Sequence, residues 1–232
     1  MLKKILGAWK FLSDTLIYIV FPPFCPLCRE IVDERGDICS ACIEKVVRQD
    51  FYLTPPAQIE KVMRLTKYRG GTRELLRKLK FDNDLRVLPT LKKFLEIAST
   101  DSKVEEILNG VDVAVFVPLH EERLKQRGYN QTELIFSDWL TARGVRTENF
   151  LKRTKQTPRL FKLSPAERRE TLKDAFETVE GADVAGKKIL IVDDIYTTGA
   201  TVAECAKALK KANAAQIFVL ALASDFGSVE SA

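Results

Sequence analysis

Strand-like stretches alternate with helical apolar patterns along most of the chain. Four stretches have the apolar, β-branched character of buried strands: residues 59–68, 111–117, 189–192 and 215–223. Between them, apolar positions recur every three or four residues, as in residues 72–81, where Leu75, Leu76 and Leu79 share one helix face. Strands that alternate with helices predict an α/β fold, a mainly parallel sheet with helices on both faces.

Weaker patterns supply the remaining elements. Residues 147–151 and 175–179 are predicted as two further strands, and residues 87–98 as a helix. Residues 99–110 are predicted as a polar connection with one short helical turn. The stretch after Val117 is predicted as a loop, followed by a helix that carries Leu134, Ile135 and Trp139.

The first twenty residues, MLKKILGAWKFLSDTLIYIV, are apolar with a basic pair near the start. Lys10 and Asp14 interrupt the run, so it is unsuited to span a bilayer, and no small-residue cleavage site of a signal peptide follows. We expect an amphipathic helix that docks on the protein itself, with docking on a membrane surface as the alternative.

Four cysteines follow at the spacing C-x2-C-x10-C-x2-C: Cys25, Cys28, Cys39 and Cys42. Two such pairs can place four thiolates around one tetrahedral Zn²⁺. Disulfides are disfavoured because no secretion signal precedes them. A redox CxxC stands singly, and iron–sulfur clusters usually have other spacings. The sequence predicts a structural zinc unit within residues 1–50 and an α/β domain over residues 51–232. Cys205 lies on the apolar face of a later helix and is predicted to be a core residue.

The residues most suited to bind a ligand are gathered in residues 189–201, ILIVDDIYTTGAT. The strand leads into two acids, Asp193 and Asp194, and then into a turn that opens a helix: Thr197, Thr198, Gly199, Ala200 and Thr201. Free N–H groups and the dipole at a helix start favour an anion such as a phosphate. The acids suit a ribose diol or a Mg²⁺ ion. A helix cap alone would need only one such residue, so we predict a 5-phosphoribosyl ligand.

Charge is distributed unevenly along the chain. The 232 residues are 46% hydrophobic and 30% charged, ordinary for a soluble globular protein, with a net charge of +5. Residues 61–80 carry a net +7 and residues 152–173 a net +6, which leaves −8 for the remainder. Concentrated positive charge suits a polyanionic partner. His120 is the only histidine, which excludes a His-rich metal site and argues against any catalytic scheme with two histidines.

Residues 189–201 resemble the 5-phosphoribosyl-1-pyrophosphate (PRPP) signature of type I phosphoribosyltransferases: four apolar residues, two acids, two spacers and Thr-Thr-Gly-x-Thr. The resemblance implies the type I phosphoribosyltransferase fold, with the threonine turn on the 5-phosphate, the acids on the diol and Mg²⁺ accompanying PRPP. It also implies that the loop after residues 111–117 receives the pyrophosphate, through Leu119, His120, Arg123 and Arg127.

A closer resemblance extends along nearly the full chain. FPPFCPLC, CSAC, KYRGGTRELLRKLKF, VPLHEERLKQRGYNQTELI and LKRTKQTPRLFKLSPAERRETLKDAF occur in this order before the signature. The chain is similar to the ComF family of bacterial competence proteins and their gluconate-associated relatives. It departs from that pattern at Thr171 and Asp174, where the family usually has Asn and Gly. The resemblance implies a cytoplasmic protein, peripheral at the inner face of the membrane if the first helix docks there, that helps incoming single-stranded DNA.

Two functions are therefore considered. In the first, the protein binds PRPP or a related phosphoribosyl ligand and acts in DNA uptake, contacting single-stranded DNA and proteins of the uptake machinery. The candidate DNA residues are Arg73, Arg77 and Lys80, which share one helix face. The alternative is an active, Mg²⁺-dependent phosphoribosyltransferase that acts on an unknown base or nucleotide. No residue pattern identifies a catalytic base or an acceptor site.

Overall fold

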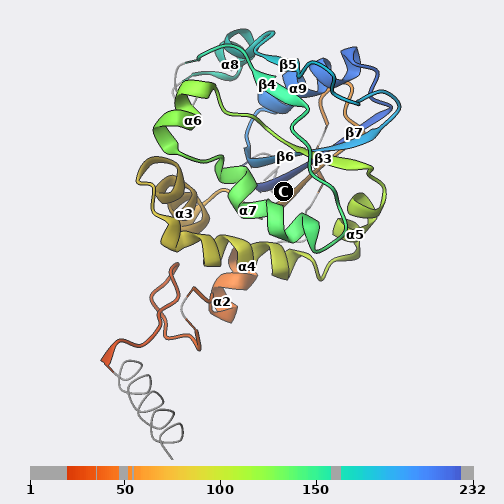
Figure 1. Ribbon diagram of the computed structural model, residues 1–232. Coiled ribbons are helices and arrows are strands. Elements are labelled where there is room, and N and C mark those ends of the chain that lie inside the picture. Colours follow the sequence, from red (N-terminus) through yellow and green to blue (C-terminus); the bar gives the residue numbers. More distant parts are fainter. Residues whose placement is uncertain (1–19, 35, 47–51, 54, 158–162, 226–232) are drawn as a thin grey trace, which may run out of the picture.

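The computed structural model describes residues 20–34, 36–46, 52–53, 55–157 and 163–225. Its centre is a five-stranded sheet in the order β1-β2-β7-β6-β3 (Figure 1). The strands are β1 Tyr52–Leu53, β2 Lys61–Lys67, β3 Val113–Phe116, β6 Lys188–Tyr196 and β7 Gln216–Ser224. β2, β7, β6 and β3 are mutually parallel neighbours, and β1 adds an antiparallel edge. The predicted mainly parallel sheet is confirmed, with β6 at an interior position.

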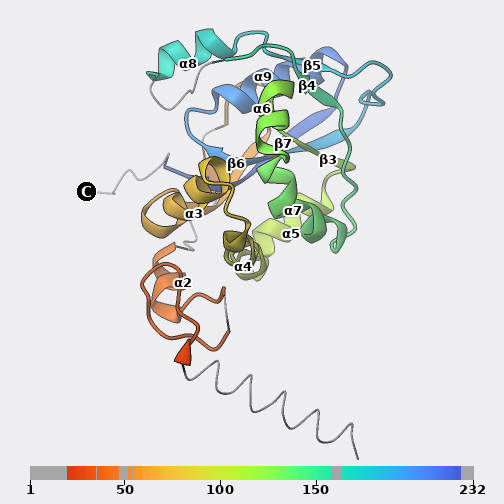
Figure 2. The ribbon, with the colours of Figure 1, turned by 60° about the vertical axis from the view of Figure 1, so that its left-hand side comes forward.

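Helices cover both faces of this sheet (Figures 1 and 2). The helices are α2 Ser40–Val46, α3 Gly70–Phe81, α4 Leu88–Ala98, α5 Ser102–Asn109, α6 Glu121–Arg127, α7 Gln131–Thr141, α8 Pro165–Leu172 and α9 Ala200–Lys211, with a 3₁₀ turn, η1, at Leu85–Val87. α3, α4, α5 and α7 pack on one face, and α9 packs on the other. Because strand side chains alternate, Leu190 and Val192 of β6 join the first core, and Ile189 and Ile191 join the second.

The two apolar cores hold the strands in place. Phe94 of α4 and Phe136 of α7 are fully buried beneath one face, and Cys205 of α9 is fully buried beneath the other. Burial of one phenylalanine side chain stabilises the fold by roughly 1.5–3 kcal/mol. The prediction that Cys205 is a core residue is confirmed.

Two predicted strands lie outside the main sheet. β4 Leu151–Arg153 and β5 Phe176–Thr178 pair antiparallel with each other and pack against α9. Of the predicted strand at residues 147–151, Thr147 forms only an isolated bridge to Ala114. The local pattern predicted extended backbone correctly but carried no information about its partner, because strand pairing is decided by packing between distant segments.

Two connections are more helical than the sequence predicted. Residues 102–109 form α5, a two-turn helix whose buried residues are Val104, Ile107 and Leu108. The stretch after Val117, predicted as a loop, contains α6. His120 is the N-cap of this helix and Gly128 its C-cap, in the left-handed region with φ +83°. No residue of α6 is buried, so apolar periodicity could not show it.

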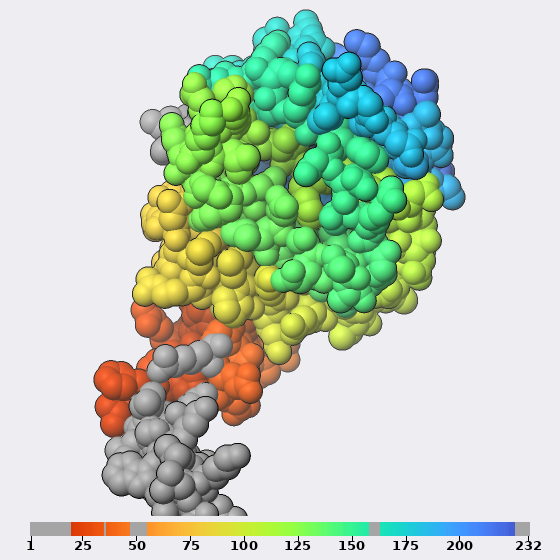
Figure 3. Space-filling view, viewed as in Figure 1, coloured from red at the N-terminus to blue at the C-terminus, as the bar shows by residue number. Residues whose placement is uncertain are grey.

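The cysteine-containing segment packs beneath α3 and α4 (Figures 2 and 3). Cys25, Ile38 and Cys42 belong to the same apolar core as α3 and α4. Thr90 of α4 donates a hydrogen bond of 3.0 Å to the carbonyl oxygen of Gly36. The predicted N-terminal helix over residues 1–20 lies almost entirely outside the described residues. Among the described helices, none combines the length and hydrophobicity needed to cross a membrane.

Candidate functional site

The acidic pair lies within β6. The strand continues through Asp193 and Asp194 to Tyr196, because β7 stays paired with it up to Ser224; the prediction that the strand ends before the acids is wrong by four residues. Strand alternation turns Asp194 towards α3, where Lys80 contacts it, and Asp193 towards Cys205 of α9. The two carboxylates therefore have different surroundings.

Asp194 forms a buried ion pair with Lys80. The Nζ of Lys80 donates to Oδ1 of Asp194 at 2.9 Å and lies 2.8 Å from Oδ2, which accepts no well-aligned hydrogen bond. The two side chains are only 18% and 3% exposed. Lys80 therefore contacts the acidic pair of residues 189–201, although it lies on the same face of α3 as Arg73 and Arg77, as the sequence predicted. That this face binds DNA stays a prediction.

The surroundings of Asp193 favour its neutral form. Its Oδ1 accepts the backbone N–H of Asp194 at 2.8 Å. The pKa of Asp193 is raised to about 8, mainly by burial and to a lesser degree by the charge of Asp194, and Lys80 opposes the shift. A carboxyl group with this pKa is mostly protonated at pH 7, so the acidic pair carries less negative charge than two free carboxylates.

The threonine turn connects β6 to the start of α9. Gly199 has φ +74°, and a Cβ there would lie 2.6 Å from the hydroxyl oxygen of Tyr196, so both the backbone and the space require glycine. Thr198 Oγ1 is buried without a hydrogen-bond partner among the described residues. Arg168 of α8 donates to Thr197 Oγ1 at 3.1 Å. Ala200 begins α9 without a side-chain cap, and Thr201 lies in its first turn. An unpaired hydroxyl beside an uncapped helix start is suited to a phosphate.

The predicted pyrophosphate residues lie between β3 and α7. Arg123 and Arg127 are on α6, half-buried Leu119 precedes it, and His120 caps it by accepting the backbone N–H of Glu122 at Nδ1, 3.4 Å away. Arg127 donates to Gln131, and burial lowers its pKa while Asp194 opposes that shift. Arg127 is thus a partly buried cation whose field reaches the acidic pair.

Arg153 is a further cation that sequence reasoning did not single out. Burial, and then the charge of Arg123, lower the pKa of Arg153 to about 10, and Asp193 opposes the shift. Its guanidinium lies 5.4 Å from the centre of the Phe176 ring and donates to Thr157, whose carbonyl oxygen accepts from Arg123 at 3.2 Å. The one sequence signal was its place in the second basic stretch, two residues after the predicted strand at residues 147–151.

Of the predicted DNA residues, Arg73 and Arg77 remain on the surface of α3. Both are exposed, and Arg77 pairs with Asp82 at 3.1 Å. Lys78, between them and Lys80, pairs with Glu74 at 2.9 Å, as its i,i+4 spacing predicts.

The four N-terminal cysteines converge. The Sγ atoms of Cys25, Cys28, Cys39 and Cys42 all lie within 4.8 Å of one another, and none is in a disulfide. Tetrahedral Zn²⁺ with Zn–S bonds of about 2.3 Å needs sulfur atoms about 3.8 Å apart. The first pair lies on a knuckle, where the Arg29 N–H bonds to the Cys25 carbonyl at 2.9 Å, and the second pair opens α2. The four thiolates fit a structural zinc ion.

The acidic pair does not form a comparable site for magnesium. Within the described residues, the four cysteines are the one cluster of three or more potential metal ligands. Asp193 and Asp194 supply two carboxyl groups, of which one faces Lys80 and the other is mostly protonated. Mg²⁺ is usually held by one or two carboxylates together with phosphate oxygens of the substrate, but here Lys80 already contacts both carboxylate oxygens of Asp194.

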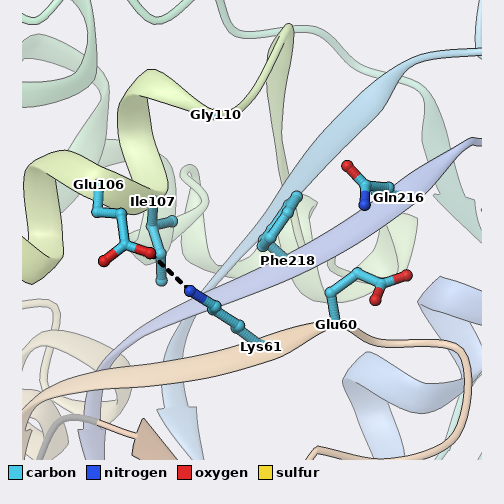
Figure 4. Close-up of a pocket in the computed structure, with 7 residues that line it drawn as sticks. All are labelled: Glu60, Lys61, Glu106, Ile107, Gly110, Gln216 and Phe218. Atoms are coloured by element: carbon cyan, nitrogen blue, oxygen red, sulfur yellow. Dashed lines mark hydrogen bonds and ion pairs between the residues drawn. The ribbon is translucent and has the colours of Figure 1, made fainter.

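A separate cavity of about 340 Å³ lies at the opposite ends of the strands (Figure 4). It is lined by Glu60, Lys61, Glu106, Ile107, Gly110, Gln216 and Phe218. Lys61 and Glu106 close part of it with an ion pair of 2.7 Å. Because Lys61 and Gln216 are the first residues of β2 and β7, the cavity is distinct from the site at the carboxyl end of β6, the usual ligand position in a parallel sheet.

Comparison with known proteins identifies both parts of the molecule. The double zinc ribbon domain family matches residues 16–52, and the phosphoribosyl transferase domain family matches residues 155–228. With the parallel sheet and the four-cysteine cluster, these matches define a phosphoribosyltransferase-fold protein with an N-terminal zinc ribbon.

Competence protein F of Haemophilus influenzae is 30% identical over 205 residues, covering 87% of this chain and 84% of that protein. The chain therefore belongs to the competence protein F family. DNA utilization protein YhgH of Escherichia coli K12 is 29% identical over 227 residues, 88% of this chain and 98% of that protein. Hypoxanthine phosphoribosyltransferase of Staphylococcus aureus aligns with TM-score 0.35 and 12% identity over 54% of this chain and 59% of that chain.

Proposed function

We propose that this protein binds PRPP or a closely related phosphoribosyl ligand at the carboxyl end of β6 and acts in DNA uptake. The observation that carries the ligand assignment is the buried Thr198 hydroxyl, which has no hydrogen-bond partner among the described residues and lies in the turn before the uncapped start of α9. A buried polar group without a partner costs free energy that a bound phosphate oxygen would recover.

The rest of the site supplies groups for the remainder of such a ligand. The turn from Thr197 to Thr201 would hold the 5-phosphate, and Asp193 and Asp194 would accept hydrogen bonds from, or donate them to, the ribose hydroxyls. Arg123 and Arg127 are the proposed contacts of the pyrophosphate, since guanidinium groups bind phosphate oxygens in a bidentate manner. Any Mg²⁺ that accompanies PRPP would have to be held by the ligand's own phosphate oxygens, because Lys80 faces Asp194.

Calorimetric titration of ribose 5-phosphate and PRPP into the full chain tests this assignment. Thr198→Val keeps the side-chain shape and removes the hydroxyl, so both ligands should bind about tenfold more weakly or worse, as the loss of a hydrogen bond to a charged group predicts. Thr141→Val, at the exposed end of α7, is the matched control. Unchanged binding of both ligands by the Thr198 variant would refute the phosphate assignment.

The DNA role rests on charge and on the relatives. The relatives are called competence and DNA utilization proteins, and the basic stretches at residues 61–80 and 152–173 include the exposed Arg73 on α3. We propose that single-stranded DNA binds through this charge, with the exposed Phe81 at the end of α3 as a stacking platform. Proteins of the uptake machinery are the further partners that this role implies.

A second candidate function, phosphoribosyl transfer, is favoured by the two arginines that converge on Thr157. Arg123 and Arg153, which both donate to Thr157, would hold a departing pyrophosphate. In such a transfer the bond from C1 to pyrophosphate breaks, and a nitrogen of the acceptor bonds to C1 and loses its proton. Release of pyrophosphate from PRPP in the presence of free bases or DNA would support this activity. PRPP binding without release under all of these conditions would limit the protein to a binding role.

A further inference from the structure

The surroundings of Asp194 lead us to propose that this protein binds its phosphoribosyl ligand without a divalent metal ion, because Lys80 supplies the positive charge beside the acidic pair. The inference rests on the proposed function and adds a property of the same site. It makes Lys80 a specificity-determining residue that selects a metal-free polyanionic sugar phosphate.

The ammonium group of Lys80 is held in place by the fold. Lys80 lies in the last turn of α3, next to the fully buried Leu79. Tyr129 lies between α6 and α7, and its hydroxyl donates to the carbonyl oxygen of Leu79 at 2.7 Å. This hydrogen bond connects the last turn of α3 to the segment that contains the predicted pyrophosphate residues. A side chain held in this way reaches Asp194 without a large further loss of conformational freedom, unlike an exposed lysine.

The lysine occupies the position at which a metal ion would meet the acidic pair. Both carboxylate oxygens of Asp194 lie within 2.9 Å of its Nζ. A Mg²⁺ ion bound to this carboxylate would have to displace Lys80 and leave a mostly buried ammonium group without its partner. Breaking a buried ion pair on one side is strongly unfavourable, so the present arrangement resists the exchange.

The charge around the pair is already suited to a polyanion. Two partly buried guanidinium groups, Arg127 and Arg153, act on Asp194 and Asp193, and Lys80 adds a third cation. The acidic pair, Asp193 and Asp194, carries at most two negative charges against these three positive charges. The chain can therefore neutralise phosphate charge with its own side chains, which is the task that a bound metal ion performs in many phosphate sites.

The test measures PRPP affinity calorimetrically with Mg²⁺ present and with Mg²⁺ removed. Ligand and buffer are passed over a resin that retains Mg²⁺, and the protein is dialysed into this buffer, because direct contact with EDTA or the resin would extract zinc from the four cysteines. We expect the wild-type Kd for PRPP to agree within about twofold in the two conditions. Lys80→Met should weaken metal-free binding by about tenfold or more, as loss of a charge-assisted contact predicts, and added Mg²⁺ should restore part of it.

Lys78→Met is the matched control, because it removes the same charge two residues away, where Lys78 pairs with Glu74 on the exposed face of α3. The control should bind PRPP as wild type does in both conditions. Wild-type binding that requires Mg²⁺ would overturn this inference and leave the proposed function intact. Absence of PRPP binding in both conditions would overturn the proposed function itself. These two outcomes need no variant, so they hold even if Lys80→Met fails to fold.

Discussion

The side chain of Leu27 lies directly over Gly71. A Cβ built at Gly71 would be 2.1 Å from Cδ2 of Leu27, so the zinc knuckle fits on the first turn of α3 only because that position has no side chain. The last turn of the same helix carries Lys80, which holds Asp194. α3 thus joins the cysteine cluster to the candidate ligand site.

This contact predicts that Gly71→Val will weaken the packing of the zinc knuckle on α3 and destabilise the protein. The added side chain overlaps Leu27, and overpacking of this kind typically destabilises by about 1–3 kcal/mol, which urea unfolding should detect. Gly110→Ala is the control, since a Cβ there has no neighbour closer than 3.5 Å. Equal stability of the Gly71 variant and the wild type would show that the knuckle does not rest on α3 in solution.

The cysteine cluster predicts about one Zn²⁺ per chain, bound by four thiolates. Cys39→Ser should lower the zinc content and the melting temperature together, because metal binding and folding of such units are coupled. Cys205→Ala, which removes a thiol in the core beneath α9, should leave the zinc content unchanged. Metal analysis and thermal unfolding of the same samples decide the matter. Zinc-free wild-type protein with an undiminished melting temperature would contradict the assignment.

The raised pKa of Asp193 predicts a stability that falls as pH rises. The unfolded chain ionises this carboxyl near pH 4, whereas in the folded protein, where Asp194, Lys80, Arg153 and Cys205 surround it, the pKa is about 8. Its stabilising contribution is therefore fully present below pH 4 and is lost as pH rises to about 8.

Asp193→Asn imitates the neutral carboxyl at every pH. Relative to the wild type, this variant should gain free energy of unfolding as the pH rises from 4 to 8. Above pH 8 the difference should level off. Asp138→Asn, whose exposed carboxylate pairs with Lys92 and has a lowered pKa, serves as control and should show no such gain. A pH-independent difference for Asp193→Asn would mean that Asp193 is ionised in the folded protein.

The DNA proposal predicts binding that weakens steeply with salt and depends little on sequence. Arg73→Glu combined with Arg77→Glu should reduce the affinity for single-stranded DNA strongly, since each change removes an attraction and adds a repulsion. Arg146→Glu with Lys211→Glu, two reversals outside both basic stretches, should have a small effect. Gel-shift titrations at two salt concentrations measure both properties. Binding that ignores salt, or that survives the α3 double reversal, would exclude this surface.

The sequence by itself determined the local parts of this protein. Residues 189–201 determine a strand, an acidic pair and a helix start because each follows from neighbouring residues, and the cysteine spacing determines a cluster in the same way. The alternation of strand-like stretches with helical patterns along the chain was sufficient to predict a mainly parallel sheet with helices on both faces. These features depend on short-range geometry, which contiguous residues specify.

Only the tertiary structure decided what surrounds the acidic pair. Lys80 is 114 positions from Asp194, and its helical pattern placed it with Arg73 and Arg77. Arg153 was not identified because the pairing of β4 with β5, and so its burial near Asp193, is set by packing against α9. Such contacts depend on how whole helices and strands pack together. That packing is set by the free energy of burying apolar surface, to which the entire chain contributes. The charge of the candidate ligand site is therefore a property of the fold that no single stretch of sequence contains.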